Sequence, residues 1–432
     1  MGRTRGEGGA EALCITGVAS GGEGVGRLGD GRVVFVEGAI PGDRVELADL
    51  RLEKKRARAR IGRLVEPSPD RVEPRCPSFG ACGGCAWQHM RYSAQLEAKR
   101  TILRDALRRI GGVDADPGID IVASPDAYAY RARARLVEGD AGIGYRRRGS
   151  REVEPIGTCP ILVPAAQEVL RDLVRSTKPG AQTDPSAAAG AGGKEVRRHR
   201  RVREWIISSG SSGRAIVAQA GSRRRRSAPR ESIVIEVLGE RLHAGSTSFI
   251  QGNALLHEAL AEEVRLQCTR PAAGRAPERF VELYAGIGFF TLPLARRNLA
   301  GRVMEGDRLA VSDLARNLAA AGLDRRVEIA SGRVEKRRDL EKHFRAVDLL
   351  LVDPPRIGLE ARVRKAIASA GPARLVYVSC DPATLARDLR DFLAAGYSLE
   401  SVRAFDLFPQ TPHVETVVRL ERRGSGIDQS VA

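Results

Sequence analysis

Chemistry in this sequence is suggested first by the segment VSCDPATL, at residues 378–385. The apolar run ARLVYV leads into Cys380, and Asp381 and Pro382 follow at once, so the cysteine stands where a strand ends and a loop begins. A thiolate in such a place is a strong nucleophile when its surroundings are electropositive. The other interpretation is a small buried core residue. The sequence predicts a nucleophilic Cys380 if further reactive groups reach the same edge.

Two carboxylates have comparable positions. Asp353 ends the apolar run LLLV and is followed by two prolines, which stop the chain from running straight into a helix. Glu415 lies in TPHVET, at the start of the last apolar run, and His413 is its neighbour. If this last strand runs antiparallel, Glu415 reaches the same edge as Cys380 and Asp353. The alternatives are a helix N-cap for Asp353 and a surface position for Glu415.

A glycine-containing turn points to a cofactor. The segment ELYAGIGFF, residues 282–290, joins an apolar strand to the helical pattern TLPLARR. Its glycines let the backbone approach a ligand at the start of the helix. The next strand ends at Glu305, 19 residues after Gly286, where an acid binds ribose hydroxyls. Thr291 replaces the third glycine of a dinucleotide motif, so an adenosine-type cofactor without pyrophosphate, such as S-adenosylmethionine, fits better. The alternative is an ordinary strand-to-helix turn.

Metal chemistry is suggested by three cysteines in one short loop. Cys76, Cys82 and Cys85 have the spacing C-x5-C-x2-C, and Cys159 in GTCPIL is a candidate fourth ligand. The chain has seven cysteines, and an odd number without an export signal argues against a disulfide framework. Four thiolates bind either a zinc ion or a [4Fe-4S] cluster, and the spacing leaves both open. The alternative is a set of free thiols.

These reactive residues need a scaffold, and the C-terminal part of the sequence predicts one. From about residue 270, continuous apolar runs alternate with helical patterns. This alternation is typical of an α/β fold with a doubly wound parallel sheet, whose ligands bind beyond the carboxyl ends of the strands. The predicted strands are ERFVELYAG, GRVMEGD, AVDLLLVDPP, ARLVYVSC, SLESVRAFDLF and HVETVVRL.

The first part of the chain has a different texture. Residues 12–66 contain about five short strands punctuated by glycines, which predicts a small β-barrel of the OB type. Residues 93–111 have apolar positions at helical spacing and end at two glycines. Residues 120–240 are mixed strand and loop, and 179–196 within them is a low-complexity loop or insertion.

The charge of the chain indicates its partner. The 432 residues carry a net charge of +17, clustered for example in RLEKKRARARIGR at 51–63 and in Arg223–Arg226. Such an excess predicts a polyanionic partner such as nucleic acid, and the alternative is a solvated arginine-rich surface. No apolar run approaches the roughly 20 residues that span a bilayer, and the first residues lack a secretory signal. We therefore expect a cytoplasmic protein that does not contact a membrane.

Taken together, these residues resemble the family of RNA uracil-C5 methyltransferases, which make 5-methyluridine. The resemblance covers nearly the whole chain and is strongest to the iron–sulfur branch that methylates large-subunit (23S) ribosomal RNA. DPPR, SCDPATLARDL and HVETV are similar to three catalytic motifs of the family, and SFIQGN at 248–253 to the segment that opens its catalytic domain. The resemblance implies that the barrel is a TRAM domain and that Cys76, Cys82, Cys85 and Cys159 bind a [4Fe-4S] cluster.

The resemblance also implies a domain organisation. The expected units are a TRAM barrel at 12–68, a central iron–sulfur and RNA-binding domain at 69–92 and 120–240, a Rossmann-like methyltransferase domain at 93–119 and 241–424, and a tail at 425–432. We expect a monomer that binds RNA. We also expect the cluster to be structural, because its ligands are far from the catalytic residues in the sequence.

The implied reaction begins when the Cys380 thiolate adds to C6 of uracil, which makes C5 nucleophilic enough to accept a methyl group. Glu415 is the implied base for the C5 proton, because a carboxyl in an enclosed site has a raised pKa. Asp353 would bind the uracil edge or the amino end of the cofactor. The implied cofactor contacts are Gln251, Tyr284, Gly286, Phe289, Glu305 and Asp353. The group that activates the Cys380 thiol is not identified by the sequence.

Two positions depart from the family pattern. Phe289 stands where an asparagine often contacts the cofactor, and Gly332 stands near the usual place of an acidic or amide residue after the third strand. Other functions also remain open: a tRNA 5-methyluridine methyltransferase, a non-catalytic RNA-binding relative, and a methyltransferase of different chemistry. The intact Cys380, Asp353 and Glu415 argue against the second, and the positive charge argues against a small-molecule substrate.

Overall fold

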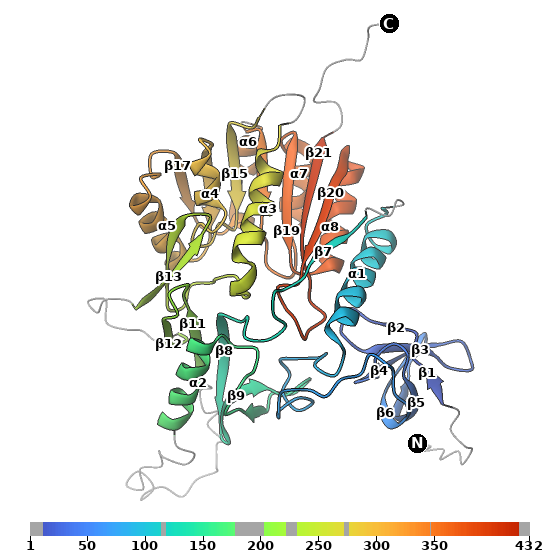
Figure 1. Cartoon of the computed structure of the whole chain (residues 1–432). Helices are drawn as coiled ribbons and strands as arrows, with labels where there is room; N and C mark the ends of the chain where they lie inside the picture. Colours follow the sequence, from blue (N-terminus) through green and yellow to red (C-terminus); the bar gives the residue numbers. More distant parts are fainter. Residues whose placement is uncertain are drawn as a thin grey trace, which may run out of the picture.

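The C-terminal part of the chain forms an eight-stranded sheet (Figure 1). The residues predicted to share one edge, Cys380, Asp353 and Glu415, lie at the ends of its strands. Its strand order is β17-β16-β15-β18-β19-β21-β20-β7, in which β17 to β19 run parallel and β21 lies antiparallel between β19 and β20. This sheet confirms the predicted α/β fold class. Its strands are β7 (Asp120–Val122), β15 (Arg279–Leu283), β16 (Ala300–Glu305), β17 (Val327–Ser331), β18 (Leu349–Val352), β19 (Arg374–Ser379), β20 (Tyr397–Phe405) and β21 (Glu415–Arg422).

The computed structural model describes the chain in six stretches, which are residues 12–113, 118–177, 203–221, 231–271, 276–345 and 347–422. The low-complexity segment 179–196, the arginine cluster Arg223–Arg226 and the expected tail at 425–432 lie outside the described residues.

Helices cover both faces of the large sheet, because alternate strand residues point to opposite sides. In β15, Phe280 belongs to one hydrophobic cluster and Val281 to another, which explains why successive residues of the strand are apolar. The first cluster packs α3 (His257–Thr269), α4 (Thr291–Arg296) and α5 (Arg308–Ala320). The second packs α1 (Tyr92–Arg109), α6 (Leu340–Phe344), α7 (Ala361–Ala370) and α8 (Pro382–Ala394).

The start of α8 fixes the position of Cys380. The Asp381 side chain accepts hydrogen bonds from Ala383 N at 3.1 Å and Thr384 N at 2.9 Å. Pro382 occupies the first helical position, where its missing N–H costs nothing. The helix therefore begins directly after the cysteine, and Cys380 is held at the junction between β19 and α8.

The N-terminal sheet has six strands, in the order β1-β5-β6-β4-β3-β2, where about five were expected. They are β1 (Leu13–Cys14), β2 (Gly17–Val18), β3 (Gly24–Arg27), β4 (Val33–Glu37), β5 (Arg44–Leu52) and β6 (Arg56–Glu66). In β6, Ala57 and Ala59 point into the core while Arg56, Arg58 and Arg60 are exposed. The alternation places a row of guanidinium groups on the outer face.

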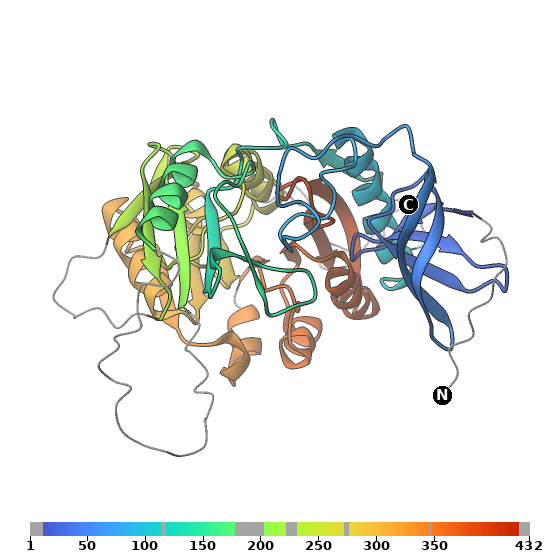
Figure 2. The same ribbon diagram turned by 90° about the horizontal axis from the view of Figure 1, so that it is seen from below.

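A five-stranded sheet follows, in the order β10-β9-β8-β11-β12 (Figure 2). It consists of β8 (Arg133–Gly139), β9 (Gly142–Arg146), β10 (Val153–Pro155), β11 (Arg203–Ser209) and β12 (Ala215–Gln219), and α2 (Pro164–Ser176) packs against it. The hairpin of β13 (Ser232–Val237) and β14 (Glu240–Gly245) shares the hydrophobic cluster of α5. The described residues also form two short 3-10 helices, η2 (Ala254–Leu256) and η3 (Val334–Lys336). Among the described residues no helix has the length and apolar character needed to span a bilayer.

Candidate active site and cysteine cavity

Strand pairing brings Cys380 and Glu415 together. Ser379 of β19 pairs with Thr416 of β21, so the residues one step beyond each, Cys380 and Glu415, occupy aligned positions. The last strand runs antiparallel to β19, which is the condition under which Glu415 reaches this edge. Glu415 is the first residue of β21 and lies at the same edge as Cys380, where it is only 3% exposed.

The Cys380 thiol is held mainly in its protonated form. Burial raises its pKa to about 12, and the negative charges of Glu415 and Asp353 contribute. Arg356 acts in the opposite direction, through its charge and through a hydrogen bond to the thiol. Arg356 is therefore the group that favours the thiolate, which the sequence had not identified, although it is the last residue of the DPPR motif.

The two carboxyls have raised pKa values for related reasons. Burial raises the pKa of Asp353 to about 7, and the Gln251 amide, which donates to Asp353 Oδ2 at 3.3 Å, lowers it slightly. Burial and the neighbouring Asp353 raise the pKa of Glu415 well above its usual value, and Arg356 opposes this. The Asp353 carboxyl is therefore able to exchange a proton near neutral pH, and the Glu415 carboxyl holds its proton more tightly than a free carboxyl does.

The glycine turn has backbone conformations that suit close approach by a ligand. Tyr284, Gly286 and Gly288 have φ values of 66°, 57° and 95°. A side chain at Gly288 would meet Leu292 at 2.6 Å, so this glycine is required for packing. Gly286 N donates to Glu305 Oε2 at 2.8 Å, which fixes the acid beside the loop as the ribose-binding hypothesis requires.

Phe289 lies under this turn. It is 7% exposed and its ring packs edge-on against His257 and Phe290, with ring centroids 5.5 and 5.1 Å away. It belongs to the hydrophobic cluster on the α3 face, so its ring presents apolar surface and no polar group. Tyr284 is oriented by its hydroxyl, which donates to Glu335 Oε1 at 2.9 Å.

Glu282 is a site residue to which the sequence had assigned no role. It is 1% exposed in β15, and burial raises its pKa to about 8. Thr291, the residue that replaces the third glycine, donates its hydroxyl proton to Glu282 Oε2 at 2.6 Å. The signal was present in the sequence, because an acid inside an otherwise apolar strand needs a partner.

The loop after DPPR is held by α8. Thr384 Oγ1 donates to Arg356 O at 3.1 Å, and Leu359 N donates to Asp388 Oδ2 at 2.8 Å. Asp388 is fully buried and also accepts from Tyr377. These contacts explain the rest of the SCDPATLARDL motif: the helix that follows the cysteine fixes the loop that carries Arg356.

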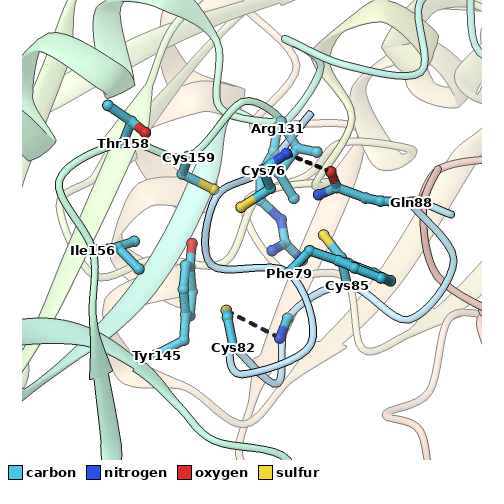
Figure 3. Close-up of a pocket in the computed structure, with 12 residues that line it drawn as sticks. Cys76, Phe79, Cys82, Cys85, Gln88, Arg131, Tyr145, Ile156, Thr158 and Cys159 are labelled. Atoms are coloured by element: carbon cyan, nitrogen blue, oxygen red, sulfur yellow. Dashed lines mark hydrogen bonds between the residues drawn. The ribbon is translucent and has the colours of Figure 1, made fainter. Parts of the chain in front are cut away.

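The four predicted cysteine ligands line one cavity (Figure 3). Cys76, Cys82 and Cys85 come from the loop before α1, and Cys159 comes from the segment before α2. Two glutamine side chains fix this arrangement: Gln88 Oε1 accepts from Cys76 N at 3.1 Å, and Gln167 Oε1 accepts from Cys159 N at 2.8 Å. Arg131, Tyr145 and Ile156 complete the wall.

Two of the thiols in this cavity, those of Cys82 and Cys159, are held in their protonated form. Burial raises the pKa of Cys82 to about 11 and that of Cys159 to about 12, and neighbouring thiols contribute. Such groups become thiolates when a cationic centre lies among them, which is the ligand chemistry of metal–thiolate sites. Within the described ranges, no three side chains of His, Cys, Asp or Glu are grouped closely enough to hold a single metal ion.

The fold and this site define a class: a methyltransferase with a Rossmann-like catalytic domain, joined to an N-terminal nucleic-acid-binding barrel. Two family models match the chain. The model for tRNA (Uracil-5-)-methyltransferase matches residues 234–423, and the model for the TRAM domain matches residues 12–59.

Whole-chain relatives make the assignment more specific. An uncharacterized RNA methyltransferase of Gloeobacter violaceus is 35% identical, over 94% of this chain and 95% of the relative. The 23S rRNA (uracil(1939)-C(5))-methyltransferase RlmD of an Azoarcus species is 34% identical, over 93% of this chain and 97% of the relative. The chain belongs to the family of RNA uracil-C5 methyltransferases, enzymes that depend on S-adenosylmethionine.

A solved structure shares the fold across the whole chain. The crystal structure of the tRNA (uracil-54, C5)-methyltransferase of Pyrococcus abyssi, in complex with S-adenosyl-L-homocysteine, superposes with a TM-score of 0.68 at 24% identity. It covers 95% of this chain and 100% of its own. The architecture, from barrel to catalytic sheet, is thus common to both proteins.

Proposed function

We propose that the protein methylates C5 of a uridine in 23S ribosomal RNA, with Cys380 as nucleophile and Glu415 as base. The observation that carries this proposal is the aligned placement of Cys380 and Glu415 at the ends of β19 and β21, with Arg356 beside both. C6 and C5 of uracil are adjacent atoms. A nucleophile for the first and a base for the second must therefore lie side by side.

The reaction follows from these groups. Arg356 stabilises the thiolate of Cys380, which adds to C6 of uracil and moves an electron pair onto the ring, so that C5 becomes a nucleophile. S-adenosylmethionine, when bound, supplies the methyl group from its sulfonium. Glu415 then takes the proton from C5, and the electron pair left behind restores the C5–C6 double bond and expels the thiolate.

The cofactor contacts are proposed on geometry. Glu305, held against Gly286 N, would bind ribose hydroxyls. Gln251 and Asp353 are joined by a 3.3 Å hydrogen bond and would lie between cofactor and substrate. Tyr284 and Phe289 would form the apolar walls. The target base must leave its stack to reach Cys380, at a cost of a few kcal/mol that phosphate contacts offset.

We also propose that Cys76, Cys82, Cys85 and Cys159 bind a [4Fe-4S] cluster with a structural role. The four thiols around one cavity support this ligand set. A single zinc ion would require the sulfurs to lie about 4 Å apart, given Zn–S bonds of about 2.3 Å. Among the described residues no three side chains of this kind are grouped so closely, which favours a cluster over a single zinc ion. Anaerobic purification, iron and sulfide analysis and the visible absorption spectrum test the assignment, and a zinc-bearing, iron-free sample would overturn it.

We choose ribosomal RNA because whole-chain relatives are named 23S rRNA methyltransferases. The protein in the solved structure is named a tRNA methyltransferase. Labelled cofactor should transfer methyl groups to an unmodified 23S rRNA fragment containing the uridine equivalent to 1939, and not to unmodified tRNA. RNA containing 5-fluorouracil should form an adduct that survives denaturation, and Cys380→Ala should abolish it. Methylation of tRNA alone would assign the other substrate. A monomeric state and a cytoplasmic location stay predictions.

A further inference from the structure

The connection between β20 and β21, residues 406–414, delivers Glu415 to the site. Gln410, in the middle of this connection, is 3% exposed. Its φ of 69° lies in the left-handed region that residues other than glycine rarely adopt. Such a conformation persists where the surroundings hold it. The contacts of Gln410 therefore show what determines the course of this connection.

The first residue that fixes the connection is Gln95 of α1. Gln410 N donates to Gln95 Oε1 at 2.9 Å, and Gln95 Nε2 donates to Gln410 Oε1 at 3.0 Å. Gln95 Nε2 also donates to the carbonyl of Met90 at 2.8 Å and to that of Trp87 at 3.1 Å. One buried amide thus joins the helix start, the cysteine-bearing loop and the connection.

Lys99, one turn further along α1, is the second residue that fixes the connection. Its side chain is fully buried, forms an ion pair with Asp406 and donates to Phe408 O at 3.0 Å. Tyr130 of the central region donates its hydroxyl proton to Pro409 O at 2.9 Å. A buried ammonium is tolerated only with such partners. The connection is therefore held at Asp406, Phe408, Pro409 and Gln410.

The cysteine loop itself also fixes the connection. Gln410 O accepts from Ala86 N at 2.9 Å and from Trp87 N at 3.0 Å, and Ala86 directly follows Cys85. Figures 1 and 2 both place the connection beside α1 and the loop that precedes it. Two backbone amides and Gln410 thus link the loop of the cysteine cavity to the connection that ends at Glu415.

We propose that Gln95, Lys99 and Gln410 are positioning residues for the removal of the C5 proton, and that they couple the cysteine cavity to the active site. The proposal rests on the proposed function, in which Glu415 is the base. When the connection is loosened, the Cys380 thiolate can still add to C6 and C5 can still accept the methyl group. The C5 proton is then removed slowly, so the methylated covalent complex accumulates.

The test uses the holoenzyme with the natural uridine-containing RNA. Gln410→Gly suits the left-handed φ and removes the bond from Gln95 Nε2 to the Gln410 side chain, and Gln95→Met removes both Gln95–Gln410 hydrogen bonds from the helix side at similar volume. We expect kcat to fall by about 10²-fold, the cost of a displacement on the order of 1 Å, while KM for RNA stays within about twofold. Protein–RNA complexes that resist denaturation should appear with ordinary uridine.

Tyr397→Phe is the matched control. It removes a buried hydrogen bond of 2.7 Å to Pro372 O, at the far end of β20. It should lower the melting temperature without accumulation of the complex. Folded Gln410→Gly and Gln95→Met proteins with unchanged kcat, or with reduced kcat and no accumulated complex, would overturn the proposal. A wild-type protein that methylates no RNA would instead overturn the proposed function.

The coupling has a readout that is independent of activity. Cys85→Ser should increase amide hydrogen exchange in residues 406–414, as Gln410→Gly does, while exchange in β15 stays unchanged. Gln410→Gly should leave the iron content of the anaerobic protein as it is in the wild type. Unaltered exchange in residues 406–414 of the Cys85→Ser protein would overturn the coupling.

Discussion

Cys380 and Glu415 lie at aligned positions on two antiparallel neighbours, one at the end of β19 and the other at the start of β21. The reversal of a single strand places a nucleophile and a carboxyl side by side, although 35 residues separate them in the chain. In a purely parallel sheet, the start of the last strand would lie at the opposite edge. The direction of β21 is thus a condition for this chemistry.

Glu415→Gln should separate the two halves of the reaction. The amide cannot accept the C5 proton, so the adduct should form and persist with uridine-containing RNA and S-adenosylmethionine, while release of methylated RNA falls by about 10²–10⁴-fold. Denaturing gel electrophoresis of the protein–RNA complex measures this. Glu400→Gln, on the exposed side of β20, is the control and should behave as the wild type. Normal turnover by Glu415→Gln would exclude it as the base.

Arg356→Ala should make Cys380 less reactive. Since Arg356 lowers the pKa of the thiol and the carboxyls raise it, loss of the guanidinium shifts that pKa upward. At a fixed pH below the pKa, the alkylation rate of Cys380 should fall by about tenfold, which corresponds to about one pKa unit. Mass spectrometry of the Cys380 peptide follows the alkylation. Arg362→Ala, on the exposed face of α7, is the control. An equal loss of alkylation rate in both variants would contradict this role.

Glu282→Gln should change how stability depends on pH. The pKa of Glu282 is raised from 4.5 to about 8 in the folded protein, so the wild type is most stabilised by the proton at low pH and loses this stability as pH rises through about 8. Glutamine keeps an acceptor for Thr291 and does not ionise. The stability of the variant relative to the wild type should therefore rise by roughly 1.4 kcal/mol per pH unit between these values. Chemical denaturation at several pH values tests this, and parallel curves would contradict it.

Arg58 and Arg60 on β6 should contribute phosphate contacts. Their side chains are 50% and 65% exposed on the outer face of the N-terminal sheet. Replacement of both by glutamine should weaken RNA binding at low salt and reduce the slope of log Kd against log salt by about 0.7 for each lost phosphate contact. Arg325 and Arg326, exposed before β17 at the edge opposite the site, form the control pair. An equal change of slope in both double variants would show that the loss of net charge, and not the loss of phosphate contacts by Arg58 and Arg60, weakens binding.

Much of the sheet could be predicted, because central strands such as β18 (LLLV) are continuous apolar runs followed by a turn residue. Cys380 and the carboxyls of Asp353 and Glu415 were visible for the same reason: polar residues at the ends of such runs are conspicuous. Phe289 was different. As an aromatic residue in a turn it has no distinguishing pattern, and only the structure shows its ring packed against His257.

The positioning residues could not be predicted in this way. Gln95 and Lys99 read as part of the polar side of an ordinary helix, yet they are 1% and 0% exposed. Their partners are 315 and 307 residues away in the sequence. Helical periodicity describes one element, whereas a buried amide pair requires two elements that meet only in the folded chain.

The short strand β7 has a consequence for how the protein is made. It pairs with β20, so the catalytic sheet takes its edge from residues that precede the central five-stranded sheet. Synthesis proceeds from the N-terminus, and domains fold as units when their residues are complete. Ile121 of β7 and Leu103 and Leu107 of α1, buried in the finished catalytic core, must wait for β20 and α8 to leave the ribosome. Until then a newly made chain exposes this apolar surface, which makes the interval before its last strands emerge the period when a chaperone is most needed.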